Sequence, residues 1–164
     1  MLFRILTIAA SLVIPSVALA QSRSSVQGVW RVQEIVVTGA NASTINNAQP
    51  GFWIFTPGHY SIVMITSGNT RPKFEGPGEP ANPTPAEKAA RYDQWSLLTA
   101  QAGTYQIQGA TITMRPVVAK NESVMAGPAR TIDFNIEGNN LWLTQRSLAG
   151  QPVSETRTKL IRVE

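Results

Sequence analysis

Short runs of alternating apolar and polar residues, separated by tight turns, constrain the fold of this chain more than any other feature. From Gly28 onward, eight runs are rich in β-branched and aromatic residues, and they cover residues 28–37, 51–56, 59–66, 103–108, 111–117, 130–136, 141–146 and 156–163. Their period of two is the pattern of a strand with one buried face. The chain is therefore predicted to be all-β.

Three connections between these runs are short enough to be hairpin turns. They are Pro57-Gly58, Gly109-Ala110, and the segment from Glu137 to Asn140. Tight hairpins join antiparallel neighbours, and sequential hairpins favour an up-and-down meander over a Greek key. Closure of the meander removes the exposed edges. We therefore expect an eight-stranded antiparallel up-and-down barrel, with a β-sandwich as the alternative.

One segment departs from the strand pattern and predicts a helix inserted in the middle of the chain. Thr84-Pro85-Ala86-Glu87 has a threonine suited to the N-cap, a proline at the first helical position and the glutamate of a capping box. The helix is expected from about residue 85 to 101. Ala89, Tyr92 and Trp95 recur at three-residue intervals, so one stripe is expected to face the protein.

The first twenty residues have the pattern of a cleavable signal peptide. Arg4 precedes an apolar run of roughly ten residues, which is about half the length needed to cross a bilayer, and Ala18-Leu19-Ala20 matches a signal-peptidase site. We therefore expect residues 1–20 to be removed and residues 21–164 to form one domain, periplasmic or secreted and not held in a membrane.

Composition excludes several kinds of site. The chain has no cysteine, so disulfides, thiolate metal ligands and cysteine nucleophiles are excluded. His59 is the only histidine, and a zinc site built from carboxylates alone is unusual, so no metal and no cofactor are predicted. The formal net charge of +4 comes from scattered cations rather than a basic stripe, which argues against a nucleic-acid partner.

Side-chain parity predicts which residues face the interior. Pairing Thr56 with His59 across the Pro57-Gly58 turn puts bulky apolar side chains of both strands on one face, and the next hairpin adds Tyr105. Aromatic residues with a polar group are suited to a pocket for a flat apolar ligand. The candidate pocket residues are Trp53, Phe55, Tyr60, Met64 and Tyr105. For each of them, ordinary core filling is the alternative.

Arg130 is the sixth candidate for ligand binding. It shares its parity with Ile132 and Phe134, so it points inward at the start of its strand. A buried arginine requires an anion, which could be a ligand carboxylate or Glu34. However, Ile35 and Val37 have the opposite parity to Trp30, which indicates a bulge that would turn Glu34 outward.

The two ends of the chain resemble the lipocalin signature. Gly28-Val29-Trp30 opens the first strand, and Leu160-Ile161-Arg162-Val163 lies in the last. Together with residues 51–61, which read GFWIFTPGHYS, the motif RPKF at 71–74 and Gly103-Thr104-Tyr105, they resemble the bacterial lipocalin-like domain family over essentially the whole mature chain. The resemblance implies a calycin-type barrel with a binding cavity, and a floor in which Arg162 lies across Trp30.

Three functions remain open from the sequence. The first is a binding module that carries or sequesters a small hydrophobic molecule. The second is a cyclase, isomerase or lyase in which Tyr60, Tyr105 or His59 handles one proton. The third is a structural protein of the envelope whose barrel is filled by side chains. A cavity of several hundred Å³ would favour the first two, and a filled interior the third.

Overall fold

The computed structural model describes residues 26–71, 82–148 and 150–164. Within this part the strands are β1 (Gly28–Gly39), β2 (Ser43–Ile45), β3 (Phe52–Thr56), β4 (His59–Ile65), β5 (Leu98–Gln108), β6 (Thr111–Ala119), β7 (Arg130–Glu137), β8 (Asn140–Arg146) and β9 (Ser154–Arg162). The helices are α2 (Pro85–Ser96) and α3 (Glu122–Ala126). The predicted signal peptide, residues 1–20, lies outside the described residues.

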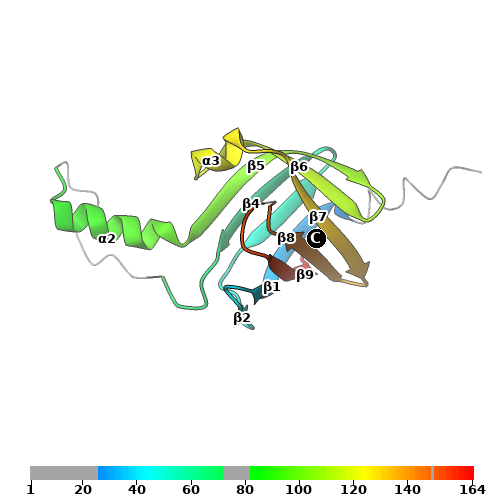
Figure 1. Cartoon of the computed structure of the whole chain (residues 1–164), viewed down its shortest axis with the longest axis horizontal. Coiled ribbons are helices and arrows are strands. Elements are labelled where there is room, and N and C mark those ends of the chain that lie inside the picture. The colour runs from blue at the N-terminus through cyan, green and yellow to red at the C-terminus, as the bar shows by residue number, and fades with distance from the viewer. Residues whose placement is uncertain (1–25, 72–81, 149) are drawn as a thin grey trace, which may run out of the picture.

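The strands form one antiparallel sheet that closes on itself (Figure 1). From β3 to β9 each strand pairs with its neighbour in sequence, β1 pairs with β3, and β9 returns to pair with β1. The closing ladder runs from Trp30 opposite Arg162 to Gly39 opposite Ser154. The predicted eight-stranded up-and-down barrel is therefore confirmed, and the sandwich alternative is wrong.

The short strand β2 is an addition that the sequence analysis did not include. It pairs with the second half of β1, from Ile35 to Val37, whereas β3 pairs with the first half, from Gly28 to Arg31. Because β9 occupies the other edge of β1, β2 extends the barrel wall beyond the end of β3. Three residues are too few to show an alternating pattern, which is why this strand was missed.

The predicted register of the first hairpin is confirmed. Thr56 lies opposite His59, and Phe55 lies opposite Tyr60. Gly58 has a φ of 81°, in the left-handed region that a two-residue hairpin turn favours and that glycine adopts at little cost. This turn therefore fixes which side chains of β3 and β4 point into the barrel.

The predicted bulge in β1 is also present. The ladder between β1 and β9 shifts register between Val32 and Glu34. Trp30, Val32 and Ile35 are all buried, so the inward parity changes across the bulge. Glu34 consequently shares its face with Lys159, its cross-strand partner, and not with the interior.

The mid-chain helix begins as predicted but ends early. Thr84 is the N-cap of α2, and its hydroxyl oxygen accepts a hydrogen bond from the backbone N–H of Glu87. The Glu87 carboxylate in turn accepts a hydrogen bond from the backbone N–H of Thr84. The helix ends at Ser96 rather than near residue 101, because Leu98 already pairs with Ile65 in the ladder between β4 and β5. The predicted end of the helix, near residue 101, is therefore wrong.

The expectation that one stripe of this helix packs on the protein is wrong as well. None of the residues of α2 is buried, and Tyr92 and Trp95 are 72% and 55% exposed. The helix projects from the barrel (Figure 1). Periodicity shows which residues share a face of a helix, but it does not show that a surface lies opposite that face. No helix in the described residues is long and apolar enough to cross a membrane.

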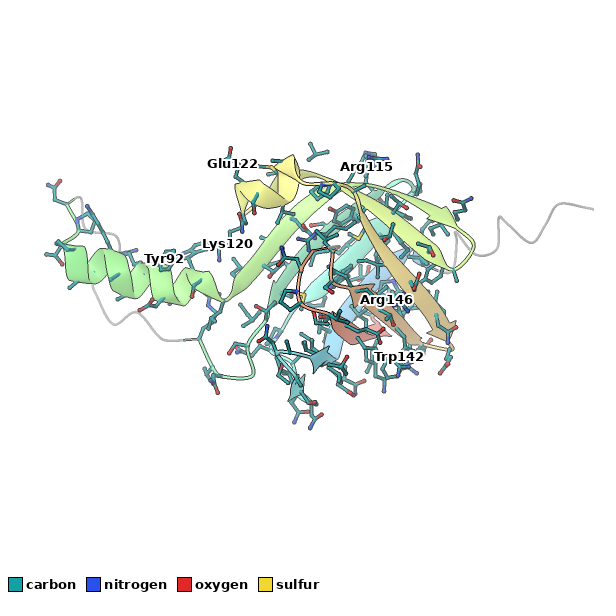
Figure 2. The ribbon with its side chains drawn as sticks, in the orientation of Figure 1. Tyr92, Arg115, Lys120, Glu122, Trp142 and Arg146 are labelled. Carbon is teal, nitrogen blue, oxygen red and sulfur yellow. The ribbon has the colours of Figure 1, made fainter. Side chains whose placement is uncertain are left out.

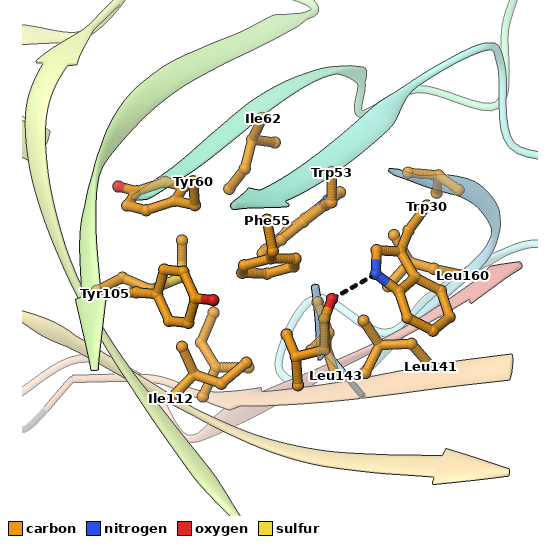
Figure 3. Packing of buried hydrophobic residues seen from close by; sticks show 14 of the residues in the cluster. Trp30, Trp53, Phe55, Tyr60, Ile62, Tyr105, Ile112, Leu141, Leu143 and Leu160 are labelled. Atoms are coloured by element: carbon orange, nitrogen blue, oxygen red, sulfur yellow. Dashed lines mark hydrogen bonds between the residues drawn. The ribbon is translucent and has the colours of Figure 1, made fainter. Parts of the chain in front are cut away.

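The barrel floor is built around Trp30, whose side chain is fully buried. Its indole N–H donates to the carbonyl oxygen of Val26 at 2.7 Å (Figure 3). The guanidinium carbon of Arg162 lies 4.0 Å from the centroid of the Trp30 ring, and Nη1 donates to the carbonyl oxygen of Gln27 at 2.8 Å. A residue from the end of the chain thus covers an aromatic ring from its beginning.

Gly28 allows this close approach. Its φ of 135° is a conformation that other residues rarely adopt. A Cβ atom at this position would lie 2.3 Å from the carbonyl oxygen of Glu164 and 2.7 Å from Nη1 of Arg162. A glycine is therefore required at the first position of the Gly-x-Trp pattern, because any larger residue would clash with the end of the chain.

Candidate functional site

The barrel contains a cavity of about 320 Å³. This volume lies within the range of small-molecule sites in proteins. The described residues that line it are Ile35, Val37, Ser43, Ile45, Trp53, Tyr60, Ile62, Met64, Thr66, Thr99, Gln101, Met114, Pro116, Arg130, Ile132, Gln145, Thr156 and Thr158. The cavity belongs to the half of the barrel opposite the floor, because its lining residues in β5 and β9 fall within the first five residues of those strands and Thr66 follows the end of β4.

Four of the six predicted ligand-binding residues line this cavity: Trp53, Tyr60, Met64 and Arg130. They come from the hairpin of β3 and β4 and from β7, which follows much later in the sequence. Parity with respect to the Pro57-Gly58 turn was sufficient to place the first three on the inner face, and the same reasoning placed Arg130. Their role in ligand binding stays a prediction.

Phe55 and Tyr105 do not line the cavity. Both lie in the packed layer between the cavity and the floor, where their rings meet edge to face with centroids 5.2 Å apart. The Tyr105 hydroxyl donates to the carbonyl oxygen of Thr56 at 3.0 Å. Figure 3 shows Phe55 in the middle of this cluster, with Trp30 on one side and Tyr60 and Tyr105 on the other. Parity gives the face of a residue but not its height within the barrel.

The polar residues of the cavity wall were not predicted from the sequence. These are short hydroxyl and amide side chains: Ser43, Thr66, Thr99, Gln101, Gln145, Thr156 and Thr158. Parity was again the available signal, since Thr99 and Gln101 share a face with Tyr105 in β5. They were missed because the predicted fourth strand began only at residue 103. The lining of the cavity therefore combines apolar side chains with short hydroxyl and amide side chains.

Two cavity-lining side chains carry buried polar atoms without a hydrogen-bond partner among the described residues. These atoms are Nε1 of Trp53 and the hydroxyl oxygen of Tyr60. The two side chains are only 8% and 3% exposed. A buried polar group left unpaired costs about 1–3 kcal/mol, so such groups are rare in native proteins without a reason. Both atoms are therefore available for a hydrogen bond with a molecule that enters the cavity.

Burial also sets the ionisation of Tyr60. Desolvation raises the pKa of the Tyr60 hydroxyl above its usual value of 10.0, and the nearby positive charge of Arg130 offsets part of this rise. The phenol is therefore neutral near pH 7 and acts as a hydrogen-bond donor as well as an acceptor.

Arg130 is the only charged side chain among the described residues that line the cavity. It lies opposite Met114 at the last paired position between β6 and β7, beyond which the two strands separate. It also lines an outer groove beside α2 and α3, together with Tyr92, Lys120 and Glu122, which Figure 2 labels. Arg130 therefore lies at the boundary between the cavity inside the barrel and the groove outside it.

Lys120 holds the end of α2 against this outer groove. Its ammonium donates to the carbonyl oxygens of Ser96 at 3.1 Å and Leu98 at 2.9 Å, and also to that of Trp95. A cation at the C-terminus of a helix satisfies the free carbonyls and interacts favourably with the helix dipole. Lys120 is therefore a structural residue of the groove rather than a free charge.

The residues considered for catalysis are not gathered in one place. His59 is exposed, and it faces outward because its neighbour Tyr60 faces inward. Of the three candidate proton carriers, only Tyr60 lines the cavity. In the described part of the chain, no three histidine or acidic side chains are close enough to hold a metal ion.

Comparison with known proteins finds a distant likeness in fold but no match in sequence. No protein-family model matches the chain, and no curated protein sequence matches it significantly. The fold is similar to the crystal structure of an uncharacterized protein from Bacteroides eggerthii, with 10% sequence identity, 83% of this chain and 98% of that chain covered, and a TM-score of 0.44. At this TM-score the likeness supports no conclusion about the family or the function of this chain.

Proposed function

We propose that this chain is an exported lipocalin-like protein that binds a small hydrophobic molecule in the barrel cavity. The observation that carries the proposal is a closed barrel whose interior holds a cavity of about 320 Å³, lined mostly by apolar side chains. A barrel filled by its own side chains, as a purely structural role would favour, has no such space. The lipocalin-like assignment draws on the Gly28 and Trp30 pattern and on Arg162 lying over the Trp30 ring.

The apolar wall supplies the affinity. Micromolar binding requires a free energy of about 8 kcal/mol, which corresponds to burying roughly 330 Å² of apolar surface before the cost of association is counted. A ligand enclosed among Ile35, Ile62 and Ile132 loses most of its own exposed surface in addition to covering theirs. The proposal is therefore a carrier or sequestering protein with micromolar or tighter binding.

The experiment is a titration with N-phenyl-1-naphthylamine, a neutral probe whose fluorescence rises in apolar surroundings. The expected result is saturable binding of one probe per chain. Thr99 lines the cavity and lies opposite Met64, so Thr99→Trp is expected to narrow the cavity and weaken binding at least about tenfold through steric overlap.

A matched control is available on the same strand. Ala102 lies opposite Ser61 on the outer face of the barrel and lines neither the cavity nor the outer groove, so Ala102→Trp adds the same side chain away from both and should leave the affinity unchanged. Equal effects of the two substitutions, or a failure of the probe to bind the unaltered protein, would contradict binding in the barrel.

Export rests on residues 1–20 and is tested separately. If the signal peptide is cleaved after Ala20, the mature protein begins at Gln21. The intact mass of the protein recovered from the periplasm or medium of an expressing bacterium would show this cleavage. Recovery of the uncleaved chain from the cytoplasm would contradict export without touching the binding proposal.

A further inference from the structure

The chemistry around Arg130 specifies more than an apolar ligand. An arginine side chain cannot lose its proton in a protein, so a partly buried one remains charged and is stabilised by an anion that offsets the loss of water. Arg130 is half-buried and lines a cavity in which every other lining residue that the structure describes is uncharged.

The chain does not supply that anion from its nearest candidates. Glu34, which the sequence offered as a partner, is turned to the outer face by the bulge in β1 and lies opposite Lys159. Asp133, three residues along β7, faces outward and accepts hydrogen bonds from Arg146 at 2.6 Å and Thr111 at 3.0 Å. Glu122 lines the outer groove together with Arg130 but is not paired with it, because both ion pairs found among the described residues are formed by Arg146.

Tyr60 provides a second donor on the same cavity. Its hydroxyl is buried and has no hydrogen-bond partner among the described residues, and both Tyr60 and Arg130 line the cavity, where the positive charge of Arg130 acts to lower the pKa of the Tyr60 hydroxyl. Because the phenol is neutral near pH 7, it can donate its proton in a hydrogen bond to an anion that Arg130 binds. One cation and one unpaired hydroxyl thus converge on a cavity without a negative charge.

The position of Arg130 also orients the ligand. The ladder between β6 and β7 runs from Thr111 to Met114, and Arg130 occupies its open end, while Ile132 lies nearer the floor opposite Ile112. A molecule bound to Arg130 by its polar end would point its apolar part toward Ile132 and Ile62. Its charged group would then remain beside the outer groove.

We infer that the ligand is an amphiphile with one carboxylate, held by the guanidinium of Arg130 and the hydroxyl of Tyr60, with its apolar chain directed toward the barrel floor. This inference rests on the proposed function, because it names the chemistry of the molecule that the cavity binds. An alcohol or ester of the same chain length fits the cavity equally well but leaves Arg130 without an anion.

The test compares dodecanoate with dodecanol as competitors that displace N-phenyl-1-naphthylamine at neutral pH. The two molecules share the same chain and differ in their charge. We expect dodecanoate to bind the unaltered protein at least about tenfold more tightly, since a hydrogen bond between charged groups in a cavity is worth that factor or more. This comparison needs no variant, so it decides the inference even if a substitution impairs folding.

Substitutions then assign the preference to its residues. Arg130→Gln should abolish the preference for the acid while leaving the affinity for dodecanol within about twofold, and Tyr60→Phe should weaken dodecanoate binding about threefold. Arg115 is the matched control, because it is exposed and lies on the neighbouring strand next to Met114, the partner of Arg130. Arg115→Gln removes the same charge and should change neither affinity.

The outcomes separate this inference from the proposal on which it rests. If the fluorescent probe does not bind at all, the proposed function is wrong. If the probe binds but the acid and the alcohol displace it equally, or if Arg130→Gln retains the preference for the acid, then the cavity binds ligands and the carboxylate inference alone is overturned.

Discussion

Replacing Trp30 with alanine should remove a large part of the stability of this protein. Trp30 is fully buried, and deletion of a buried tryptophan side chain costs about 3–5 kcal/mol. This loss includes the hydrogen bond to the Val26 carbonyl, worth about 1 kcal/mol, and the contact with Arg162, worth ~0.5–2 kcal/mol. Since small domains are stable by only about 5–15 kcal/mol, roughly a fifth or more of the total is at stake.

A double-mutant cycle isolates the contact between the two ends of the chain. The free energies of unfolding of Trp30→Leu, Arg162→Met and the double variant should give a coupling of about 1 kcal/mol. Trp142 and Arg157 form the control pair, because the guanidinium lies 4.2 Å from the indole centroid on the outer face of the barrel. This outer pair, in which Arg157 is exposed and Trp142 half-buried, should give a smaller coupling, ~0.5 kcal/mol, because water screens it.

Urea unfolding followed by far-UV circular dichroism measures these differences. The slope of the free energy against urea should stay the same among the variants, which keeps the comparison within a two-state description. If Trp30→Ala lowers the stability by less than about 1 kcal/mol, or if the inner and outer pairs couple equally, the description of the barrel floor is refuted.

Three further predictions concern separate parts of the molecule. Gly28→Ala should destabilise the protein by more than about 2 kcal/mol in a thermal melt. Gly58 also has a positive φ but has open space around it, so Gly58→Ala should cost only about 1 kcal/mol. Equal losses for the two variants would contradict the steric explanation for Gly28. The pKa of Asp133 is lowered by its hydrogen bonds, of which the bond with Arg146 has the larger effect and the bond with Thr111 the smaller. Its contribution to the stability of the fold is therefore present above pH 3.8 and is lost as the pH falls through the lowered pKa. Because the pair is exposed, Asp133→Asn should remove no more than about 0.5 kcal/mol of urea stability at neutral pH and less in acid, and a loss that grows in acid would contradict this. The pKa of Tyr60 is raised by burial, so its contribution is present below pH 10.0 and lost as the pH rises through the folded-state pKa. Tyr60→Phe should therefore flatten the alkaline decline of stability, and an unchanged decline would show that Tyr60 ionises normally.

Strand parity and turn position predicted most of the barrel from the sequence. Once the Pro57-Gly58 turn fixed Thr56 opposite His59, the inward face of β3 and β4 followed, and the change of parity between Trp30 and Ile35 located the bulge. These inferences succeeded because side chains of a strand must alternate between water and the core.

The sequence predicted the middle of the chain less well. Residues 97–102, reading LLTAQA, have neither β-branched alternation nor a turn residue, and they are as compatible with a helix as with a strand. Tertiary pairing with β4 decides for the strand from Leu98 onward. Two polar residues of the cavity wall, Thr99 and Gln101, were missed with it, because they lie in this segment.

The height of a residue within the barrel also cannot be obtained from parity. Phe55 and Tyr60 lie directly opposite each other and share the inner face, yet only Tyr60 reaches the cavity. The difference depends on strand tilt and on the packing of Phe55 against Tyr105, which are properties of the closed barrel.

The most direct test of ligand binding within the barrel is a set of intermolecular nuclear Overhauser effects from dodecanoate to methyl-labelled protein. The account predicts contacts from the methylene chain to the methyl groups of Ile62, Met114 and Ile132, which line the cavity. The methyl groups of Ile54, Val63 and Val118, which are exposed on neighbouring strands, should show none. Contacts to the exposed set alone, or no contacts at a concentration that saturates the protein, would contradict a hollow barrel that encloses its ligand.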